Sequence, residues 1–385
     1  MKEFKSIVKE LEKLDLSARK AAIATVVQVR GSSYRSPGAR MFITDDGRWI
    51  GSISGGCLEG DALRQARQVM NDRTPQTVTY DTREGSNQNL GISLGCNGII
   101  DVLIEPVDAQ DTLGTVALYK TLVAAPSALA MATVFGGPPG EIGRKLVCGE
   151  DSGVHGNVVD IRLRERLKQD LQMLLHERIS HARQYDIQGV LYQVFVELVQ
   201  PAVSLIIFGG GFDARPVSHL AKTLGWDVTV TDECVAHIVP LFFPTADKLS
   251  LCQRSFVDHE FPITTSTACL LMSHNYEYDR DVLRKLLPTS APFIGILGPR
   301  KRFDKMLAEY AQTGLTLRDE DFGRIHSPVG LDIGAEAADE IAVSIVAEIQ
   351  SKFANRNGGS LRYRGGPIHE RDESSDQVFK QLYIH

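Results

Sequence analysis

Hydrophobic and polar positions in the first half of the chain predict helices and strands in a mixed order. Residues 4–16 form an amphipathic helix, whose apolar residues follow helical spacing: Phe4, Ile7, Val8, Leu11 and Leu14. The next predicted elements are a strand at 21–30, a hairpin over 40–54 that turns at Asp46–Gly47, a helix over 58–70, and strands at 76–80 and 99–107. Residues 108–200 add a helix, two strand-like runs around GGPPGEIG, a charged helix near 160–177 and a strand at 191–198. No internal repeat is visible in the sequence.

The pattern changes at Pro201, where short apolar runs begin to alternate regularly with helical segments. VSLIIFGGG (203–211) is a buried strand that ends in glycines, and it is followed by a helix and by the strand WDVTVTDE (226–233). Further strands at 268–274 and 291–298 are each followed by a helix, and a last helix ends near residue 350. This alternation predicts a parallel sheet with helices on both faces.

The expected fold class is therefore α/β, with two domains and a tail. An N-terminal α/β domain occupies 1–200, a Rossmann-like doubly wound domain occupies 201–350, and a Gly/Arg-rich tail occupies 351–385. The length of 385 residues agrees with two domains, since one hydrophobic core seldom grows that large.

Composition narrows the class of partner. Hydrophobic residues make up 43% of the chain and charged residues 23%, as in ordinary globular proteins. The net charge of -6 gives no attraction to nucleic acid or to an anionic membrane, so a small molecule or a protein is the expected partner. The N-terminal helix carries charges and is not a signal peptide, and no apolar run could span a bilayer; cytoplasm is the simplest expected location.

A nucleotide-binding motif opens the second domain. Gly209 to Ala214 fit G-x-G-x-x-A: Gly209 permits the tight turn, and Gly211 lets backbone amides approach a pyrophosphate. Asp232 or Glu233, at the end of the next strand, could accept hydrogen bonds from ribose hydroxyls. The glycines could equally serve packing alone, and a carboxylate at Asp213 would repel a phosphate.

Three further loops follow strands of the same predicted sheet and should converge on its crevice: 273–276, 298–302 and 327–332. Arg300 and Arg302 could neutralise phosphates, or could simply start a solvated helix. His274 could act as a general base or as a hydrogen-bonding contact to a ligand, although a single histidine is more often structural.

Two of the six cysteines stand out because glycines flank them. Cys57 follows Gly55 and Gly56 at a predicted helix start, where the helix dipole and free amides would stabilise a thiolate. Cys96, in LGCNG, repeats this arrangement. The pair favours a soft-ligand or sulfur-handling site, with Cys57 as a candidate metal contact. The absence of C-x-x-C argues against a compact zinc site, and the remaining thiols are expected to pack in the core: Cys148, Cys234, Cys252 and Cys269.

Arginines surround the loop at 31–38, which also carries hydroxyl groups and Tyr34. Arg30, Arg35 and Arg40 could hold a phosphorylated heterocycle, and a plain solvated loop explains the same residues.

These segments together resemble the XdhC/CoxI family of xanthine dehydrogenase accessory proteins. GSSYRSPGARM, GSISGGCLEG and LGCNGIIDVLIEP are similar to its first domain. LIIFGGGFDARPVSHLAKTLGWDVTVTD, SHNYEYDRDVL, FIGILGPRKR and HSPVGLDIGAEAADEIAVSIVAEI are similar to its Rossmann domain, and GGSLRYRGGPIH to its tail. Many relatives have G-x-G-H after the Rossmann strand, whereas this chain has Phe212-Asp213, which weakens the case for a nucleotide.

The resemblance implies a cytoplasmic chaperone that binds the sulfurated molybdenum cofactor and helps to insert it into xanthine dehydrogenase or a related molybdenum hydroxylase. A cysteine desulfurase is the implied sulfur donor, and a homodimer stays open. The cofactor is a pterin (molybdopterin) that binds molybdenum through a dithiolene and ends in a phosphate or a cytosine dinucleotide. Cys57 is the implied contact at the metal end.

Two hypotheses from other classes compete with this one. The first is an NAD(P)-dependent oxidoreductase built on the Rossmann domain, with Cys57 as a redox or nucleophilic thiol. The second is a structural protein that bridges partners and binds nothing small.

Overall fold

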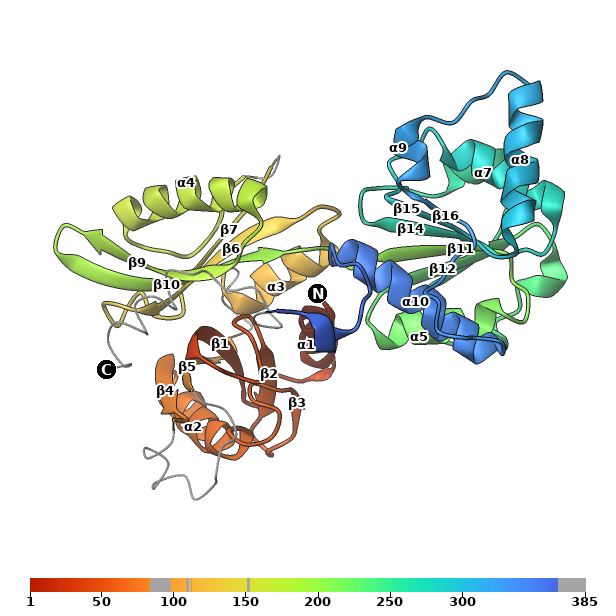
Figure 1. Cartoon of the computed structure of the whole chain (residues 1–385). Helices are drawn as coiled ribbons and strands as arrows, with labels where there is room; N and C mark the ends of the chain where they lie inside the picture. Colours follow the sequence, from red (N-terminus) through yellow and green to blue (C-terminus); the bar gives the residue numbers. More distant parts are fainter. Residues whose placement is uncertain (84–97, 109–110, 112, 151–152, 366–385) are drawn as a thin grey trace. The chain divides into compact units, whose positions relative to one another are not determined.

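The protein is described by a computed structural model over residues 1–83, 98–108, 111, 113–150 and 153–365 (Figure 1). These residues form two compact units, one within 3–201 and one within 202–365. The first unit contains two antiparallel sheets with four helices, and the second contains one parallel sheet. Among the described residues, no helix combines the length and apolar character needed to cross a membrane.

Each sheet of the first unit has five strands. The first sheet has the order β3-β2-β1-β5-β4 and the second the order β8-β7-β6-β10-β9. The strands of the first sheet are Ala21–Gly31 (β1), Arg40–Thr44 (β2), Trp49–Gly51 (β3), Gln76–Asp81 (β4) and Gly98–Pro106 (β5). Those of the second are Leu129–Gly136 (β6), Lys145–Gly149 (β7), His155–Gly156 (β8), His181–Ile187 (β9) and Val190–Val199 (β10). The helices are Lys2–Lys13 (α1), Glu59–Asp72 (α2), Thr115–Ala124 (α3) and Ile161–Glu177 (α4).

The two sheets repeat one topology, although no internal repeat is visible in the sequence. Each half of the unit runs helix, three strands, helix, two strands, and each sheet then orders its strands 3-2-1-5-4. The register repeats as well. Thr25 lies opposite Arg40 as Thr133 lies opposite Lys145, and Ile23 lies opposite Glu105 as Met131 lies opposite Glu197. We call residues 2–106 the first repeat and residues 115–199 the second repeat.

Buried charges link the two repeats reciprocally. The guanidinium of Arg40 in the first repeat pairs with Glu197 in the second, and also donates from Nε to the Tyr119 hydroxyl at 2.9 Å. In the opposite sense, Nζ of Lys145 lies 2.6 and 2.7 Å from the two carboxylate oxygens of Glu105. All of these side chains are buried. Because an unpaired buried charge is costly, the two pairs fix how the sheets meet.

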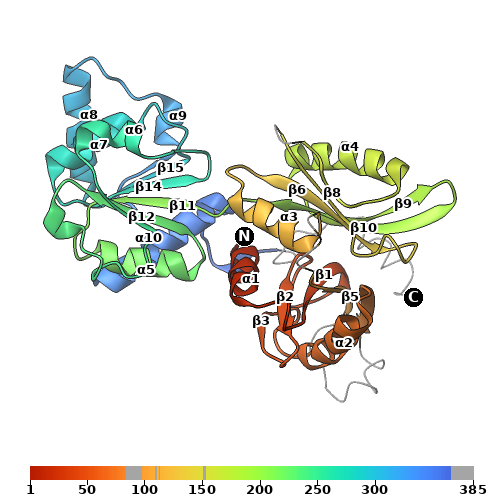
Figure 2. The same cartoon turned by 180° about the vertical axis from the view of Figure 1, so that it is seen from behind.

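Alternation along the strands decides which face each helix covers. In β1, Ala22 and Ala24 pack in the cluster formed with α2, whereas Ala21 and Ile23 pack in a cluster that includes α1 and α3. The same cluster contains residues of the second sheet, such as Met131, while α4 covers that sheet's other face. Figure 2 shows α2 and α4 on their respective sheets from behind.

The second unit is the predicted Rossmann-like domain. Its six strands are all parallel, in the order β13-β12-β11-β14-β15-β16, so the chain reverses its direction of winding between β11 and β14. The strands are Ser204–Phe208 (β11), Asp227–Asp232 (β12), Lys248–Leu251 (β13), Thr267–Leu271 (β14), Phe293–Ile296 (β15) and Ile325–His326 (β16). The short edge strands β13 and β16 were not predicted, because too few residues carry their pattern.

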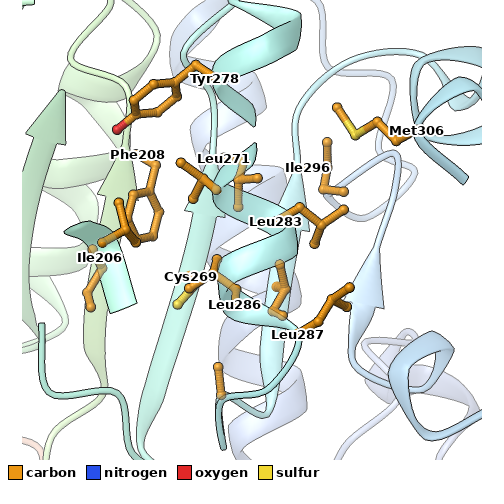
Figure 3. Close-up of a cluster of buried hydrophobic side chains, with 14 of the residues drawn as sticks. Ile206, Phe208, Cys269, Leu271, Tyr278, Leu283, Leu286, Leu287, Ile296 and Met306 are labelled. Carbon is orange, nitrogen blue, oxygen red and sulfur yellow. The ribbon is translucent and has the colours of Figure 1, made fainter. Parts of the chain in front are cut away.

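Helices cover both faces of this sheet, as predicted (Figure 1). One face packs against Ala214–Thr223 (α5) and Ala338–Phe353 (α10); the other packs against Val257–Glu260 (α6), Tyr276–Leu286 (α7) and Arg300–Gln312 (α8). The short helix Asp319–Phe322 (α9) and the 3-10 turns Val235–His237 (η2), Arg254–Phe256 (η3) and Leu361–Tyr363 (η4) complete the unit. Figure 3 shows Cys269 on β14 in the hydrophobic cluster on the α6, α7 and α8 face of this sheet, near Ile206 and Leu286.

Candidate functional site

The connection between β3 and α2 is wrapped around one buried carboxylate. Glu59, the first residue of α2, turns its side chain back into the loop that precedes it. Its two oxygens accept hydrogen bonds from six donors: the N–H groups of Ile53, Ser54, Gly55 and Gly56 and the hydroxyl groups of Ser52 and Ser54. The loop is therefore held in shape by an anion that belongs to the protein itself. We call residues 52–58 the thiol loop.

This arrangement corrects the expectation of free amides beside Cys57. Four loop amides already bind Glu59, the N–H of Leu58 donates to the Ser54 hydroxyl at 2.9 Å, and α2 begins two residues after Cys57. Burial alone would raise the pKa of the Glu59 carboxyl, but the hydroxyls of Ser54 and Ser52 and the loop amides outweigh it and lower the pKa to about 2. The thiol loop thus has no amide nest to offer a phosphate.

The outer side of the thiol loop is open at Gly56 and Cys57. Gly55 has φ +86° and lies under the Tyr34 ring, which a Cβ atom at Gly55 would approach to 2.7 Å. The 31–38 loop and the thiol loop therefore meet at this point. A Cβ atom at Gly56 would have no neighbour within 4 Å, and the Cys57 side chain is half-buried at the edge of the α2 core. A ligand could therefore reach the thiol from the side of Gly56.

The arginines near this loop are engaged with carboxylates. Arg35 pairs with Glu3 of α1, and Nη2 of Arg30 lies 2.6 Å from Oδ2 of Asp101. Arg40 is buried and pairs with Glu197, as described above. None of the three presents an unpaired guanidinium to a ligand. Arg40 in particular has a structural role, because its charge holds the two repeats together.

The remaining cysteines divide into buried and exposed thiols. Cys148, Cys252 and Cys269 are buried, which confirms their predicted packing role, and burial raises the pKa of each thiol, for Cys269 to about 12. Cys234 is exposed, so the prediction that it packs in the core is wrong; it follows β12, where the chain turns to the surface at η2. Cys96 lies outside the described residues.

In the second unit, the glycine turn after β11 is filled by the protein's own groups. A Cβ atom at Gly209, whose φ is +119°, would lie 2.5 Å from the backbone of Ser273, and one at Gly210 would lie 2.5 Å from the His237 carbonyl oxygen. The N–H of Gly210 donates to Oδ2 of Asp232 at 2.9 Å. Both glycines are thus explained by close packing.

The acidic residues at the end of β12 already have partners within the protein. Asp232 is buried and accepts a further hydrogen bond from the N–H of Cys234 at 2.8 Å, while Nδ1 of His237 lies 2.9 Å from its Oδ2. The Glu233 carboxylate pairs with Arg254. Neither carboxylate is free for a ribose, and η2 lies against the glycine turn. The usual contacts of an NAD(P) dinucleotide are therefore missing from this turn, and the residues do not fit that cofactor.

A histidine–aspartate pair lies where the sheet reverses direction. Nε2 of His274, after β14, is 3.0 Å from Oδ2 of Asp213, after β11. His274 adopts a positive φ of +59°, and a Cβ atom at Gly211 would lie 3.6 Å from its ring. The sequence pattern identified His274 as a candidate site residue, whereas the Asp213 carboxylate was expected only to repel a phosphate. Both residues follow strands that become neighbours in the sheet, which is the signal that could have paired them.

The other predicted loops of the crevice meet only in part. Residues 297–299 and 328–335 line one pocket of about 590 Å³, together with Ile341 and Ser344 of α10, which confirms that two of the three loops converge. Arg300 is largely exposed, with Nε 3.7 Å from Oδ1 of Asp304. Arg302 donates to buried Asp279 at 2.7 Å.

The fold and the loop together define a class of two-unit proteins. One unit is a duplicated antiparallel unit with a half-buried loop thiol, and the other is Rossmann-like. Residues 16–81 match the model of the XdhC and CoxI family, and residues 205–349 match the model of the XdhC Rossmann domain. The chain belongs to the XdhC/CoxI family.

Relatives match along most of the chain. A Bacillus subtilis (strain 168) protein named as a probable subunit of xanthine dehydrogenase is 31% identical over 329 residues, which cover 86% of this chain and 92% of that protein. The molybdenum cofactor insertion chaperone PaoD of Escherichia coli K12 is 25% identical over 87% of this chain and 84% of its own length. A crystal structure of a xanthine dehydrogenase from Bacillus halodurans superposes with a TM-score of 0.75 at 28% identity and covers 94% of this chain and 98% of that one.

Proposed function

We propose that this protein is a chaperone of the molybdenum cofactor, which binds the cofactor and assists its insertion into xanthine dehydrogenase or a related molybdenum hydroxylase. The observation that carries the proposal is the thiol loop, which holds Cys57 accessible in a loop that Glu59 has already ordered. The relative named a molybdenum cofactor insertion chaperone supports the same function.

The donor set of the thiol loop suits the metal end of this cofactor. Among the described residues, no group of three His, Cys, Asp or Glu side chains could hold a bare metal ion. A single accessible thiol such as Cys57 suits a metal that the cofactor itself already binds through sulfur, because a soft ligand then adds only one contact. Ordering by Glu59 before binding would lower the entropic cost of that contact.

Considered by itself, the second unit offers contacts for a phosphate or a nucleotide. The N–H groups of Gly211 and Phe212, at the start of α5, are not used by the described residues, and His274 lies beside Gly211. Asp213 is a weaker obstacle than its charge suggests, because its carboxylate already pairs with His274. Arg300 is exposed and follows β15 of the same sheet, so we include it as a phosphate contact.

The proposal extends to the sulfurated cofactor. A cysteine desulfurase would supply the sulfur, and Cys57 would touch the molybdenum or its labile sulfide. The protein would work in the cytoplasm.

Replacing Cys57 by Ala tests the proposal directly. We expect the variant to retain much less molybdenum and pterin than the wild type after gel filtration, and to transfer less cofactor to a cofactor-free hydroxylase. Cys234→Ala is the matched control, because it removes an exposed thiol from the other unit. Unchanged retention and transfer in Cys57→Ala would contradict the assignment of Cys57.

The oxidoreductase alternative makes a different prediction for the same protein. Because Gly210 and Asp232 are already bonded to each other, we expect no tight binding of NAD or NADP and no turnover of reduced nicotinamide. Mixing the protein with NAD, NADP, cytidine nucleotides and free molybdenum cofactor separates the hypotheses. Binding of none of them would favour a purely structural bridging protein.

A further inference from the structure

A second pocket of the Rossmann-like unit lies beside α5, on the face of the sheet that α5 and α10 cover. It has a volume of about 430 Å³ and lies between the first turns of α5 and the loop at 241–245. Six of its eleven lining residues are apolar: Phe212, Pro216, Leu241, Phe242, Phe243 and Pro244. The others are Arg215, Ser218, His219, Thr245 and Asp339. We call it the Arg215 pocket.

Arg215 is a cation without an anionic partner. Its guanidinium carbon lies 3.6 Å from the centre of the Phe242 ring and 5.4 Å from that of Phe212. Within the part of the chain that the structure describes, its side chain forms no ion pair and no hydrogen bond, and its Nε is shielded from solvent without a partner. Asp339 also lines the pocket but does not pair with Arg215.

Stacking on an aromatic ring leaves the edge of a guanidinium free. That edge carries parallel N–H donors, whose geometry matches the two oxygens of a carboxylate. Next to it, Phe212 and Leu241 are 69% and 82% exposed, so two large apolar side chains stand in water beside an unpaired cation. Arginine and aromatic side chains in this combination are typical of the central residues of protein interfaces.

We propose that the Arg215 pocket is a docking surface for a partner protein, which places a carboxylate on Arg215 and an apolar side chain against Phe212 and Leu241. A small ligand is the weaker fit, because small-molecule sites enclose most of their ligand whereas Phe212 and Leu241 are largely exposed at the rim. We identify the partner as the cofactor-free molybdenum hydroxylase that receives the cofactor, and this identification rests on the proposed function.

The test measures the Kd between the full chain and the cofactor-free hydroxylase of the same organism, with cofactor retention measured in parallel. Arg215→Glu should weaken docking about 30-fold or more, because it sets a carboxylate against a carboxylate. Arg215→Lys should weaken it about 3- to 10-fold, since lysine keeps the charge but loses the planar fork. Leu241→Ser, which leaves the arginine in place, should weaken it about 10-fold.

Arg284→Glu is the matched control. Arg284 is an exposed arginine of α7, a helix that covers the opposite face of the sheet, so the same charge reversal there should change the Kd less than about 2-fold. Cofactor retention should be unchanged in all four variants, which also shows that they are folded.

Three results would overturn the docking proposal: a wild-type Kd retained by Arg215→Glu, a wild type that retains cofactor but does not bind the hydroxylase, or a joint loss of docking and retention in Arg215→Glu. The last would assign the pocket to the cofactor itself. A hydroxylase that binds through Arg215 to a chain that retains no cofactor would support docking and reject the proposed function.

Discussion

The two repeats of the N-terminal unit share topology, strand register and a reciprocal pair of buried charges, but they differ in the connection between the third strand and the helix that follows it. Between β3 and α2, the first repeat carries the glycine-rich thiol loop at 52–58. Between β8 and α4, the second repeat carries residues 157–160, where Asp160 caps α4 by accepting from the N–H groups of Arg162 and Leu163 at 2.9 and 3.1 Å. The equivalent helix in the first repeat has its carboxylate inside the preceding loop instead.

This difference separates the residues that build the shared scaffold from those that form the candidate site. The second repeat caps its helix in the ordinary way and presents no thiol at this point. The first repeat instead uses the Glu59 carboxylate to order the thiol loop that carries Cys57. A duplicated scaffold can keep its strands and vary one connection, which is where function generally resides.

The largest effect we expect comes from breaking the reciprocal charge pairs. Glu197→Gln should lower the free energy of unfolding by about 3–5 kcal/mol, because Arg40 stays charged when buried. Glu105→Gln should cost less, because burial already lowers the pKa of Lys145 and the amine can lose its proton. Urea denaturation of both variants measures the difference, with Glu10→Gln at the surface of α1 as the control. Equal costs at Arg40 and Lys145 would refute this asymmetry.

The next largest effect on the free energy of unfolding should come from the residues at the starts of α2 and α4. Glu59→Gln should destabilise the protein by about 2–3 kcal/mol, because an amide cannot accept all the loop donors that the carboxylate accepts. Asp160→Ala, at the equivalent helix of the second repeat, should cost about 1 kcal/mol, the usual value for a cap. Urea denaturation compares them, and only Glu59→Gln should also reduce cofactor retention. If Asp160→Ala proved the more costly, the thiol loop would not be the specially ordered connection.

Acid should remove the contribution of Glu59 to the free energy of unfolding. Its pKa is lowered from 4.5 to about 2 in the folded protein, so the stabilisation is complete above pH 4.5 and is lost as the pH falls through 2. The difference in unfolding free energy between wild type and Glu59→Gln should therefore be constant from about pH 5 to about pH 8 and shrink below about pH 4. Denaturation at a series of pH values checks this. A difference that grew towards low pH would show that the carboxylate is not stabilised in its charged form.

The smallest effect on stability should come from the thiols themselves. In native protein, iodoacetamide should modify Cys57 and Cys234 and spare Cys148, Cys252 and Cys269, whose thiols are buried with raised pKa values. Cys57→Ala should cost less than about 1 kcal/mol, since the side chain is only half-buried. Mass spectrometry of the alkylated chain identifies the reactive sites. Protection of Cys57 equal to that of Cys148 would place it in the core and remove it from the candidate site.

Local pattern was enough to predict much of the fold. The helical spacing at the N-terminus, the hairpin at Asp46–Gly47 and the Rossmann alternation after Pro201 all appear in the structure, because each depends on residues close together in sequence. The glycine-flanked thiol at Cys57 was equally visible, since its neighbours in sequence are also its neighbours in space.

Partners distant in sequence were decided only by the tertiary structure. Arg40 and Glu197 are 157 residues apart, Lys145 and Glu105 are 40 apart, and Asp213 meets His274 only because β11 and β14 pair. The same holds for Asp232, whose carboxylate bonds Gly210 instead of facing a nucleotide. The sequence by itself determined most of the elements, the alternation of strands and helices after Pro201, and the glycine-flanked thiol. Which charges are buried together, and which loop amides remain free, depended on long-range packing that local periodicity does not encode.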